Sequence, residues 1–507
     1  MTPSQRLVIL GVLCSIFLAS MEGTVVATAM PTIVGQLGGL ATYSWVFAGY
    51  MLAATTPVPL FGKLSDLYGR RPIYAIAMSL FLAGSFLCAQ AASMSQLIAF
   101  RVIQGLGAGG ILTLAFIIIG TLFNLEQRAR LTGLFASVWG VSSIIGPLLG
   151  GFIVDHLPWP WIFYINLPPG LFAFFLIRRF WRDEERRDRA AALHIDYLGA
   201  ALLSAAVVAL LLGLFELRAG APGPLLALAA GLFAALLYVE RRSPDPVLPL
   251  ALFRDRLFAT GSGFGVWAGW ATFGSIAFVP LFVQAVLGTS ATAAGATLMP
   301  LSLAWTSAAI VSTRLLLRIG YRTLALTGAG SLTLGALLLV LASAHPGQLT
   351  LMGALTLMGA GMGCSMPSFL IAVQSSVPRG VLGTATSTMQ FARTIGGAVG
   401  VSAMGALLSF GLTARLAAAG LDPTAISVSG LLDPLTRASA GGGSAGVVRD
   451  ALAGALQPVF AISLVAAILG LIMAALAPGG HVRQFAAHRD AAAAPITPPE
   501  AKTHPAP

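Results

Sequence analysis

The sequence predicts an all-helical protein that crosses a membrane many times, and three observations carry this prediction. Of its 507 residues, 57% are apolar and only 9% are charged, and the mean hydropathy is +0.87. A soluble domain carries about 25% charged residues, so this chain could not coat its surface with solvated groups. The apolar residues also fall in runs of roughly twenty, the length that crosses a hydrocarbon core of about 30 Å. A soluble enzyme, a secreted disulfide scaffold and a disordered chain are therefore excluded.

The apolar runs predict fourteen membrane-spanning helices in a 6+2+6 arrangement. The runs cover residues 7–31, 43–62, 72–91, 96–123, 130–154, 161–180, 197–217, 222–239, 257–284, 292–313, 322–342, 347–373, 382–411 and 456–478. Ile145-Gly146 in the fifth run and Ile395-Gly396 in the thirteenth lie 250 residues apart, close to half the length of the chain. Such an offset indicates two repeated bundles, a design common among membrane transporters, whose substrate site lies at the interface of the repeats.

This arrangement divides the chain into four parts. Residues 1–180 are expected to form an N-terminal six-helix bundle, and residues 257–478 a C-terminal one. Residues 181–256 hold the two extra helices and cytoplasmic linkers. Residues 412–455, rich in Gly, Ala and Ser, are expected to be a long extracytoplasmic loop of the C-terminal bundle. The proline-containing tail, residues 479–507, is expected to be a disordered cytoplasmic segment.

The placement of the basic residues predicts the orientation of the chain in a cell membrane. The formal net charge is +11, and the 29 Lys and Arg residues are spread over alternate loops rather than gathered in one patch. With the N-terminus in the cytoplasm, 23 of them fall on the cytoplasmic side and four on the other side. The positive-inside rule therefore places both termini in the cytoplasm. Orientation in a lipid bilayer explains the charge better than nucleic-acid binding does.

Glu22 is the candidate for a functional acid. It lies well inside the first predicted span, whereas the other 17 acidic residues fall in loops or at helix ends. Because an ionised carboxylate at that depth is costly, we expect Glu22 to face a cavity or to be protonated. Such a group can bind and release protons. The alternative is a structural hydrogen bond to a neighbouring helix.

Two arginines also lie within predicted spans. Arg101 shares one face of the fourth span with Gln104, and a fixed cation there can tune the proton affinity of a nearby carboxylate. The alternative is an arginine that snorkels towards the cytoplasm. Arg393 lies deeper, in the thirteenth span, and is a candidate cavity residue. Its partner could be a carboxyl group, backbone carbonyls or an anionic group of a substrate.

The fifth span carries a face of small residues. Gly146, Pro147, Gly150 and Gly151 fall within one and a half helical turns, and Gly146 and Gly150 form a GxxxG pair. Such a face lets another helix approach closely, and the proline adds a bend. The functional interpretation is a seal between moving helices, and the alternative is ordinary helix packing.

A charged segment after the second span is the candidate for a conformational latch. Asp66 lies between basic residues, with Arg70 and Arg71 after it, and Gly62 and Gly69 flank the segment. The glycines allow tight turns, and the charges can pair in one conformation and separate in another. The alternative is ordinary charge in a solvated loop.

The sequence predicts no enzyme, no cofactor and no metal site. Residues 105–110 and 441–446 fit the pattern GxGxxG, but neither segment follows a strand, so neither predicts a dinucleotide site. The patterns GxxxxGK[ST] and HExxH are absent, and the six His residues do not cluster. The absence of GxxxxGK[ST] argues against ATP hydrolysis in this chain, and the exporter hypothesis below takes a proton gradient as the energy source.

These motifs resemble the fourteen-span drug:proton antiporter branch of the major facilitator superfamily, the EmrB- and QacA-like multidrug efflux transporters. The resemblance covers nearly all of the chain up to about residue 478. The segments that carry it are Gly62–Arg71, Arg101–Gly110, Gly146–Gly151, Glu22–Val26 with Met30-Pro31, Phe163–Pro168, and Gly288-Thr289-Ser290 with Gly295 and Pro300. It implies the major facilitator fold, a role of Arg101 in proton transfer, and an exporter's motif in the fifth span.

Three positions depart from the pattern of this branch. Glu22 stands where Asp is usual, Leu67 where a basic residue is common, and Ser142 where glycine is usual. Leu67 weakens the latch interpretation, and none of the three removes the predicted proton site.

The resulting hypothesis is a proton-driven exporter of amphipathic, cationic or neutral drugs that works by alternating access. An alternative on the same fold is a dedicated exporter of one metabolite, amino acid or lipid. A second alternative, a membrane receptor, would need a signalling domain, for which the 29-residue tail is too short. In a cell with two membranes, a periplasmic adaptor protein is a further expected partner.

Overall fold

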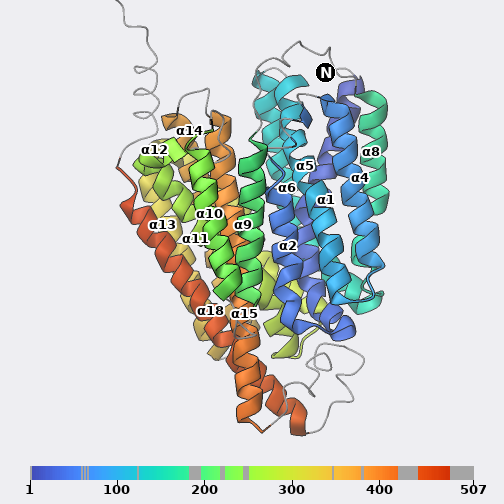
Figure 1. Cartoon of the computed structure of the whole chain (residues 1–507), viewed down its shortest axis with the longest axis vertical. Coiled ribbons are helices and arrows are strands. Elements are labelled where there is room, and N and C mark those ends of the chain that lie inside the picture. The colour runs from blue at the N-terminus through green and yellow to red at the C-terminus, as the bar shows by residue number, and fades with distance from the viewer. Residues whose placement is uncertain are drawn as a thin grey trace, which may run out of the picture.

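The structure is a computed structural model in which every regular element described is a helix (Figure 1). It describes residues 3–58, 61, 64–65, 68–122, 125–181, 196–216, 223–243, 250–344, 347–377, 382–420 and 443–479. The predicted disordered tail therefore lies outside the described residues, apart from residue 479. The all-helical prediction is confirmed.

The first group of helices is formed by the N-terminal part of the chain. Within it, α1 packs against α6 and α8, and α5 packs against α2 and α4. The helices of this group are α1 (Pro3–Leu37), α2 (Tyr43–Thr55), α4 (Arg70–Ala89), α5 (Met94–Leu122), α6 (Leu125–His156), α7 (Trp161–Tyr164) and α8 (Leu167–Phe180), with a short 3₁₀ helix, η1 (Leu40–Thr42).

The second group is formed by the C-terminal part. Here α14 packs against α12 and α13, and α11 packs against α15 and α18. Its helices are η3 (Leu250–Arg254), α11 (Arg256–Ala285), α12 (Ala291–Ile319), α13 (Tyr321–Ala344), α14 (Gln348–Ser376), α15 (Leu382–Ala418) and α18 (Gly443–Leu476). The two groups meet where α6 packs on α12 and α2 packs on α15.

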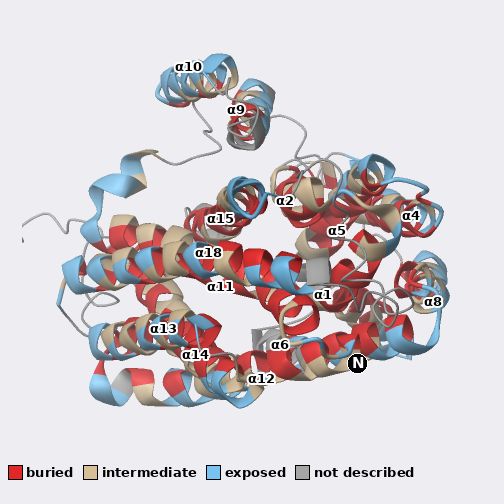
Figure 2. Ribbon diagram, turned by 90° about the horizontal axis from the view of Figure 1, so that it is seen from below, coloured by how far each residue is buried: buried red, intermediate tan, exposed pale blue. Residues whose placement is uncertain are grey.

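Two further helices, α9 (Tyr197–Glu216) and α10 (Gly223–Glu240), stand to one side of both groups (Figure 2). They pack on each other, and α9 also contacts α15. An apolar cluster joins them to α2 and α15, and its buried members include Ala48, Leu203, Val207, Leu236 and Ala398. Much of α10 is exposed, as expected for a helix surrounded by lipid.

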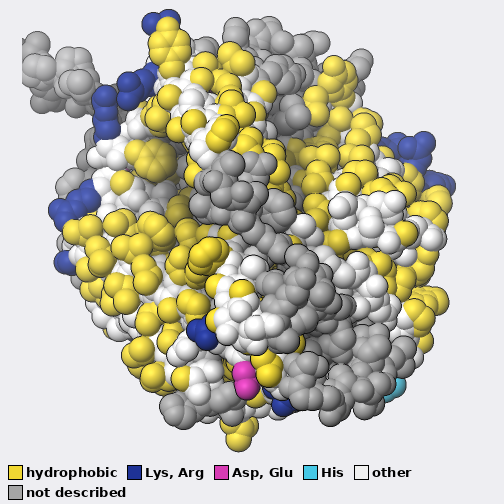
Figure 3. All heavy atoms as spheres, turned by 60° about the horizontal axis from the view of Figure 1, so that its bottom comes forward, with side chains coloured by type: hydrophobic (Ala, Val, Ile, Leu, Met, Phe, Trp, Pro, Cys, Tyr) yellow, Lys and Arg dark blue, Asp and Glu magenta, His cyan; other side chains and the backbone are white. Residues whose placement is uncertain are grey.

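Twelve helices of the described part of the chain are long and apolar enough to cross a membrane. Each of the fourteen predicted runs contains a helix, but α2 has 13 residues, and only Leu198–Leu210 of α9 could be judged. Apolar side chains cover much of the described surface that Figure 3 shows, and arginines gather at its upper margins. The chain is a multi-pass membrane protein, and the count of fourteen in a 6+2+6 arrangement stays a prediction.

One boundary predicted from hydropathy was wrong. The expected loop at 412–455 is helical at both ends, because α15 continues to Ala418 and α18 begins at Gly443. The expected span at 161–180 is one of the twelve, but a break at Ile165 and Asn166 divides it into α7 and α8. The break precedes two prolines in the first turn of α8, where a missing N–H costs nothing.

Candidate functional site

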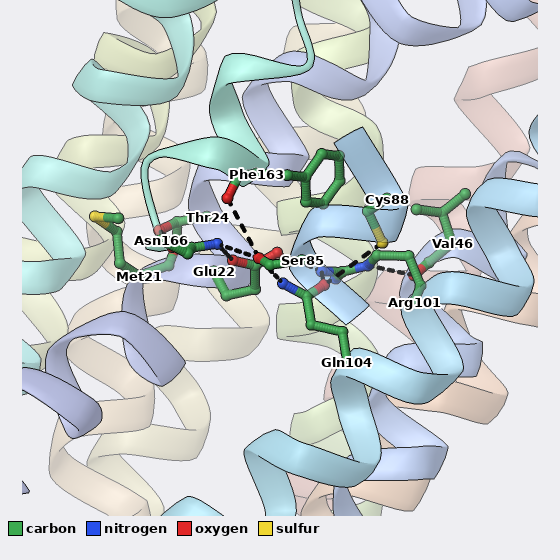
Figure 4. Close-up of polar contacts among 10 residues, drawn as sticks. All are labelled: Met21, Glu22, Thr24, Val46, Ser85, Cys88, Arg101, Gln104, Phe163 and Asn166. Carbon is green, nitrogen blue, oxygen red and sulfur yellow. Dashed lines mark hydrogen bonds and ion pairs between the residues drawn. The ribbon is translucent and has the colours of Figure 1, made fainter. Parts of the chain in front are cut away.

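Glu22 and Arg101 form an ion pair in the interior of the first helix group (Figure 4). Arg101 Nη1 of α5 donates to Glu22 Oε1 of α1 at 2.5 Å. The two side chains are each no more than 1% exposed. At such depth the pair holds together two charges that would each be costly alone, so removing one partner is expected to cost about 3–5 kcal/mol.

Three polar side chains complete the site. Asn166 Nδ2 donates to Glu22 Oε2 at 2.8 Å, so both carboxylate oxygens accept hydrogen bonds. Arg101 Nη1 also donates to Gln104 Oε1 at 2.7 Å. Ser85 Oγ accepts from Gln104 Nε2 at 2.8 Å and from Asn166 Nδ2 at 2.9 Å. Two hydrogen-bond donors on the carboxyl group, one of them a guanidinium, favour the ionised form of Glu22 in this geometry.

The backbone explains how Asn166 reaches the site. Asn166 stands between α7 and α8, at the residue before the first turn of α8, and makes no side-chain cap there. The break in the helix leaves its amide free to turn inwards to Glu22 and Ser85. The interruption of the predicted span at 161–180 therefore creates part of the site.

Aromatic rings enclose the arginine. The guanidinium of Arg101 lies 4.0 Å from the ring centre of Tyr50 and 6.0 Å from that of Phe163. Its Nε donates to the carbonyl of Val46 at 3.4 Å. Arg101 is fully buried, which excludes the alternative of a side chain that snorkels to the cytoplasm.

Glu22 points into its own helix group. Its hydrogen-bond partners belong to α5 and the α7–α8 turn, whereas Gly23 and Thr24, the next residues of α1, are partly exposed. Nothing lies within 4 Å of the position that a Cβ of Gly23 would take. Glu22 is thus buried and paired with Arg101, and its role as the proton-binding group stays a prediction.

The glycines of the fifth predicted span bring α6 against two neighbours. A Cβ on Gly150 would lie 2.6 Å from the carbonyl oxygen of Val25 in α1, and one on Gly146 would overlap Thr24. A Cβ on Gly151 would lie 2.5 Å from the Cα of Thr292 in α12. Since α1 and α12 belong to different groups, this face connects the candidate proton site to the interface between the groups.

Pro147 takes part in the same interface from inside α6. Its carbonyl oxygen lies where a Cβ of Gly295 of α12 would be, so the two backbones approach closely. The face of small residues thus does more than pack α6 within its own group.

The latch candidates are described only in part. Gly62 and Asp66 lie outside the described residues. Gly69 has φ +92°, a conformation that glycine adopts readily, and directly precedes α4. Arg70 and Arg71 begin α4, and Arg71 Nη2 donates to the carbonyl of Arg178 in α8. That contact lies within the first group, and the latch role stays a prediction.

Arg393 lies apart from this site, on α15 in the second group. Its guanidinium lies 5.7 Å from the ring centre of Phe273 and 5.9 Å from that of Trp305. Its Nε is buried without a hydrogen-bond partner. Among the described residues, none of the three partners left open by the sequence is bonded to Arg393.

The structure thus joins three predicted residues, Glu22, Arg101 and Gln104, and adds two that sequence reasoning missed. Asn166 lies in the segment Phe163–Pro168, which resembles the antiporter branch, but the neighbouring sequence gave no indication that Asn166 binds Glu22. Ser85 is one serine among many in the apolar runs, and no pattern singled it out. Within the described part of the chain, no group of three or more His, Cys, Asp or Glu residues could hold a metal ion.

Protonation of Glu22 would break its ion pair with Arg101. When a proton binds Glu22, the carboxylate loses the charge that attracts Arg101, and one oxygen becomes a donor. Fold and site together define a polytopic membrane transporter with a titratable group between its helices.

Comparison with known proteins identifies the family. The family model described as "Major Facilitator Superfamily" matches residues 12–401. "Multidrug transporter protein MdtP" of Bacillus subtilis (strain 168) is 37% identical over 411 residues, 80% of this chain and 75% of that protein. "Multidrug resistance protein 3" of the same organism is 35% identical over 424 residues, 82% of this chain and 81% of that protein. The chain belongs to the Major Facilitator Superfamily, whose members are transporters rather than enzymes.

Solved structures agree with this fold. A bacterial homolog of the human lysosomal transporter Spinster, in an inward-facing and occupied conformation, superposes with a TM-score of 0.71 at 15% identity. The match covers 94% of this chain and 97% of that one. The nucleoside transporter NupG gives a TM-score of 0.63 at 12% identity, over 93% of this chain and 99% of that one. At these identities the likeness shows the fold alone.

Proposed function

We propose that this chain exports amphipathic drugs from the cytoplasm in exchange for protons, by alternating access between its two helix groups. The relatives named as multidrug transporters support drug efflux. The observation that carries proton coupling is the buried ion pair of Glu22 and Arg101. No cofactor takes part, and the proton gradient supplies the energy.

In the proposed cycle, the observed geometry is the state without the coupling proton. Protonation of Glu22 removes the attraction that holds Arg101 of α5 to α1, while Arg101 keeps Gln104 and the ring of Tyr50 as partners. The two helices are then free to shift relative to each other. Because α6 packs on α1 through Gly146 and Gly150, the shift reaches the interface with α12.

Proton and drug are proposed to use different faces of α1. Glu22 faces the interior of the first group, whereas Gly23, the next residue of α1, is partly exposed and has nothing within 4 Å of the position of an added Cβ. A drug that lies against this part of α1 would therefore sense the state of Glu22 through the helix. Cationic and neutral amphipaths remain the proposed substrates, and a periplasmic adaptor remains a proposed partner in a cell with two membranes.

The orientation belongs to this proposal as well. With both termini in the cytoplasm, the end at which α6 meets the start of α12 is extracytoplasmic and lies at the bottom of Figure 1. The structure then corresponds to the state that is closed to the outside.

The test is proton release in proteoliposomes that contain the purified protein and an imposed pH gradient. Addition of a lipophilic cation or a neutral drug should release protons in wild type and not in Glu22→Gln, in which the amide keeps the size but cannot ionise. Asp450→Asn makes the same change at an exposed acid near the start of α18 and should behave as wild type.

Coupled release by Glu22→Gln at the wild-type rate would contradict the assignment of Glu22. Drug efflux that persists in wild type after the pH gradient is collapsed would contradict proton coupling altogether, while leaving the family unaffected.

A further inference from the structure

Arg393 is a cation in the first third of a membrane helix, α15. It stands eleven residues beyond Leu382, the first residue of α15, which places it about 16 Å along a helix that rises roughly 1.5 Å per residue. Ionisable residues at such depth are rare, and they face a protein interior or a water-filled passage. Their presence marks a functional position unless a partner explains them.

No carboxylate of the described residues pairs with Arg393. Its Nε is buried and has no hydrogen-bond partner, although the side chain as a whole is partly exposed. The contrast with Arg101 is direct, because that guanidinium donates to a carboxylate, an amide and a carbonyl. A buried Nε of a cation without a counter-charge among the described residues is costly, which favours a ligand that supplies the charge.

The aromatic rings near Arg393 compensate little of its positive charge. Phe273 of α11 and Trp305 of α12 lie at 5.7 and 5.9 Å, close to the limit of about 6 Å for this interaction. They instead form apolar walls on two sides of the guanidinium. An arginine between two aromatic rings suits a ligand that has an acidic group next to an aromatic or other apolar body.

Arg393 lies beside the interface between the two helix groups. A Cβ on Gly269 of α11 would overlap the Arg393 carbonyl, so α15 lies tightly against α11 and the side chain reaches past α11 to Trp305. One turn further along α15, a Cβ on Gly397 would lie 2.5 Å from Phe273 and 2.7 Å from Met51 of α2. Residues of both groups therefore meet beside Arg393.

We propose that Arg393 binds the anionic group of a transported drug, so that the cargo includes amphipathic molecules with a carboxylate beside an apolar ring system. This inference rests on the proposed export function and extends its substrate class, which Glu22 alone would restrict to cations and neutral compounds. Glu22 is already paired with Arg101 inside the first helix group. In this proposal Glu22 binds the proton, and Arg393 binds the anionic group of the drug.

The test uses two dyes that differ in one group. Rhodamine B carries a free carboxylate, and its ethyl ester shares the ring system but has no anionic group. Binding of each dye to the full chain in nanodiscs of phosphatidylcholine is measured by fluorescence anisotropy. Arg393→Gln should weaken binding of the acid at least tenfold more than binding of the ester, and Arg393→Lys should restore most of that preference.

Arg415→Gln is the matched control, because it removes an exposed arginine from the outer end of the same helix. It should keep the wild-type ratio of the two affinities. Equal losses for acid and ester in Arg393→Gln, or no loss for either, would overturn the inference, and so would a wild type that does not bind the acid. A wild-type affinity for the acid that disappears when phosphatidylglycerol replaces the zwitterionic phosphatidylcholine would overturn the inference and assign Arg393 to the headgroup of an anionic lipid.

Binding in nanodiscs needs no proton gradient, so this experiment tests the role of Arg393 independently of proton-coupled export. Normal proton-coupled export of the ester with no role for Arg393 would refute only the inference. Arg393-dependent binding of the acid without any proton-driven export would refute only the proposed function.

Discussion

Asp155, near the end of α6, caps the first turn of α12 through Thr292. Asp155 Oδ2 accepts from the backbone N–H of Thr292 at 2.8 Å and from its hydroxyl at 2.5 Å. Asp155 Oδ1 accepts from the backbone N–H of Ala291 at 3.2 Å. A carboxylate favours a helix N-terminus, where N–H groups have no partner within the helix. Here the carboxylate comes from the other helix group, so the cap also holds the two groups together.

Two other hydrogen bonds also connect the two helix groups. Tyr43 of α2 donates its hydroxyl to the carbonyl of Ala277 in α11 at 2.5 Å. Gln284 Nε2 of α11 donates to the carbonyl of Thr28 in α1 at 3.0 Å. Each of these bonds must break when the two groups separate at this end, so they set the stability of the closed state.

We expect Asp155→Asn to favour the open form at this end. The amide keeps one acceptor oxygen but loses the charge and the second acceptor, and a hydrogen bond to a charged group contributes about 1.5–3 kcal/mol. Because Asp155 is exposed, solvent reduces this contribution, and a threefold to tenfold rise in the open population is expected, of the order of 1 kcal/mol.

The measurement is the distance between spin labels at Leu157 and Leu349, which are 45% and 83% exposed and belong to different groups. Asp155→Asn should enlarge the long-distance population, and Asp155→Glu, which keeps the charge, should enlarge it less. An unchanged distance distribution in Asp155→Asn would show that the cap does not control closure.

Gly295→Ala should weaken the same closure by a steric route. The added methyl group would overlap the carbonyl oxygen of Pro147, and α6 and α12 would have to separate to admit it. Overpacking of this kind costs about 1–3 kcal/mol. We expect slower drug efflux and a larger open population with the same pair of labels.

Gly353→Ala is the control for this substitution. Gly353 lies inside α14, and nothing lies within 4 Å of the position of its added Cβ. Gly353→Ala should transport as wild type, and an equal loss in both variants would attribute the effect to helix stiffness rather than to the contact with Pro147.

Hydropathy predicted the class and the helices because lipid demands long apolar segments, and these can be read locally. It failed where helices continue beyond the apolar run, as at Ala418 and Gly443, because helix length and membrane depth are different quantities. It also could not see the break between α7 and α8, where two prolines start a new helix inside an apolar run.

The charged residues of the candidate site could be predicted from the sequence, but their contacts with one another could not. Glu22 and Arg101 stood out because deep charges are costly, yet 79 residues separate them, and only the packing of α1 against α5 makes them a pair. Asn166 and Asp155 gave no such indication, since an amide at a helix break and an acid at a helix end are common. Their roles depend on which helix lies opposite.

Asn166→Leu should impair coupling and stability together. The change removes the donor to Glu22 Oε2 and leaves a buried carboxylate oxygen and Ser85 with fewer partners. The expected loss is about 1–3 kcal/mol of folding free energy. A lower unfolding temperature in detergent and a reduced drug-triggered proton release are the two readouts.

The control removes a similar amide from an exposed position. Gln90 donates to the hydroxyl of Tyr164 at 2.7 Å, and Gln90→Leu should change neither readout by a comparable amount. If Asn166→Leu matches the control in both, Asn166 does not support Glu22.

The last prediction concerns the ring over Arg101. The ring centre of Tyr50 lies 4.0 Å from the guanidinium, and such an interaction contributes about 2 kcal/mol when it is desolvated. In the proposed cycle this ring keeps Arg101 in place after Glu22 is protonated, so Tyr50→Leu should slow proton-coupled efflux threefold to tenfold. Tyr50→Phe keeps the ring face and should retain most of the rate. Equal losses in both variants would assign the effect to the hydroxyl and would leave Arg101 without its proposed support in the protonated state.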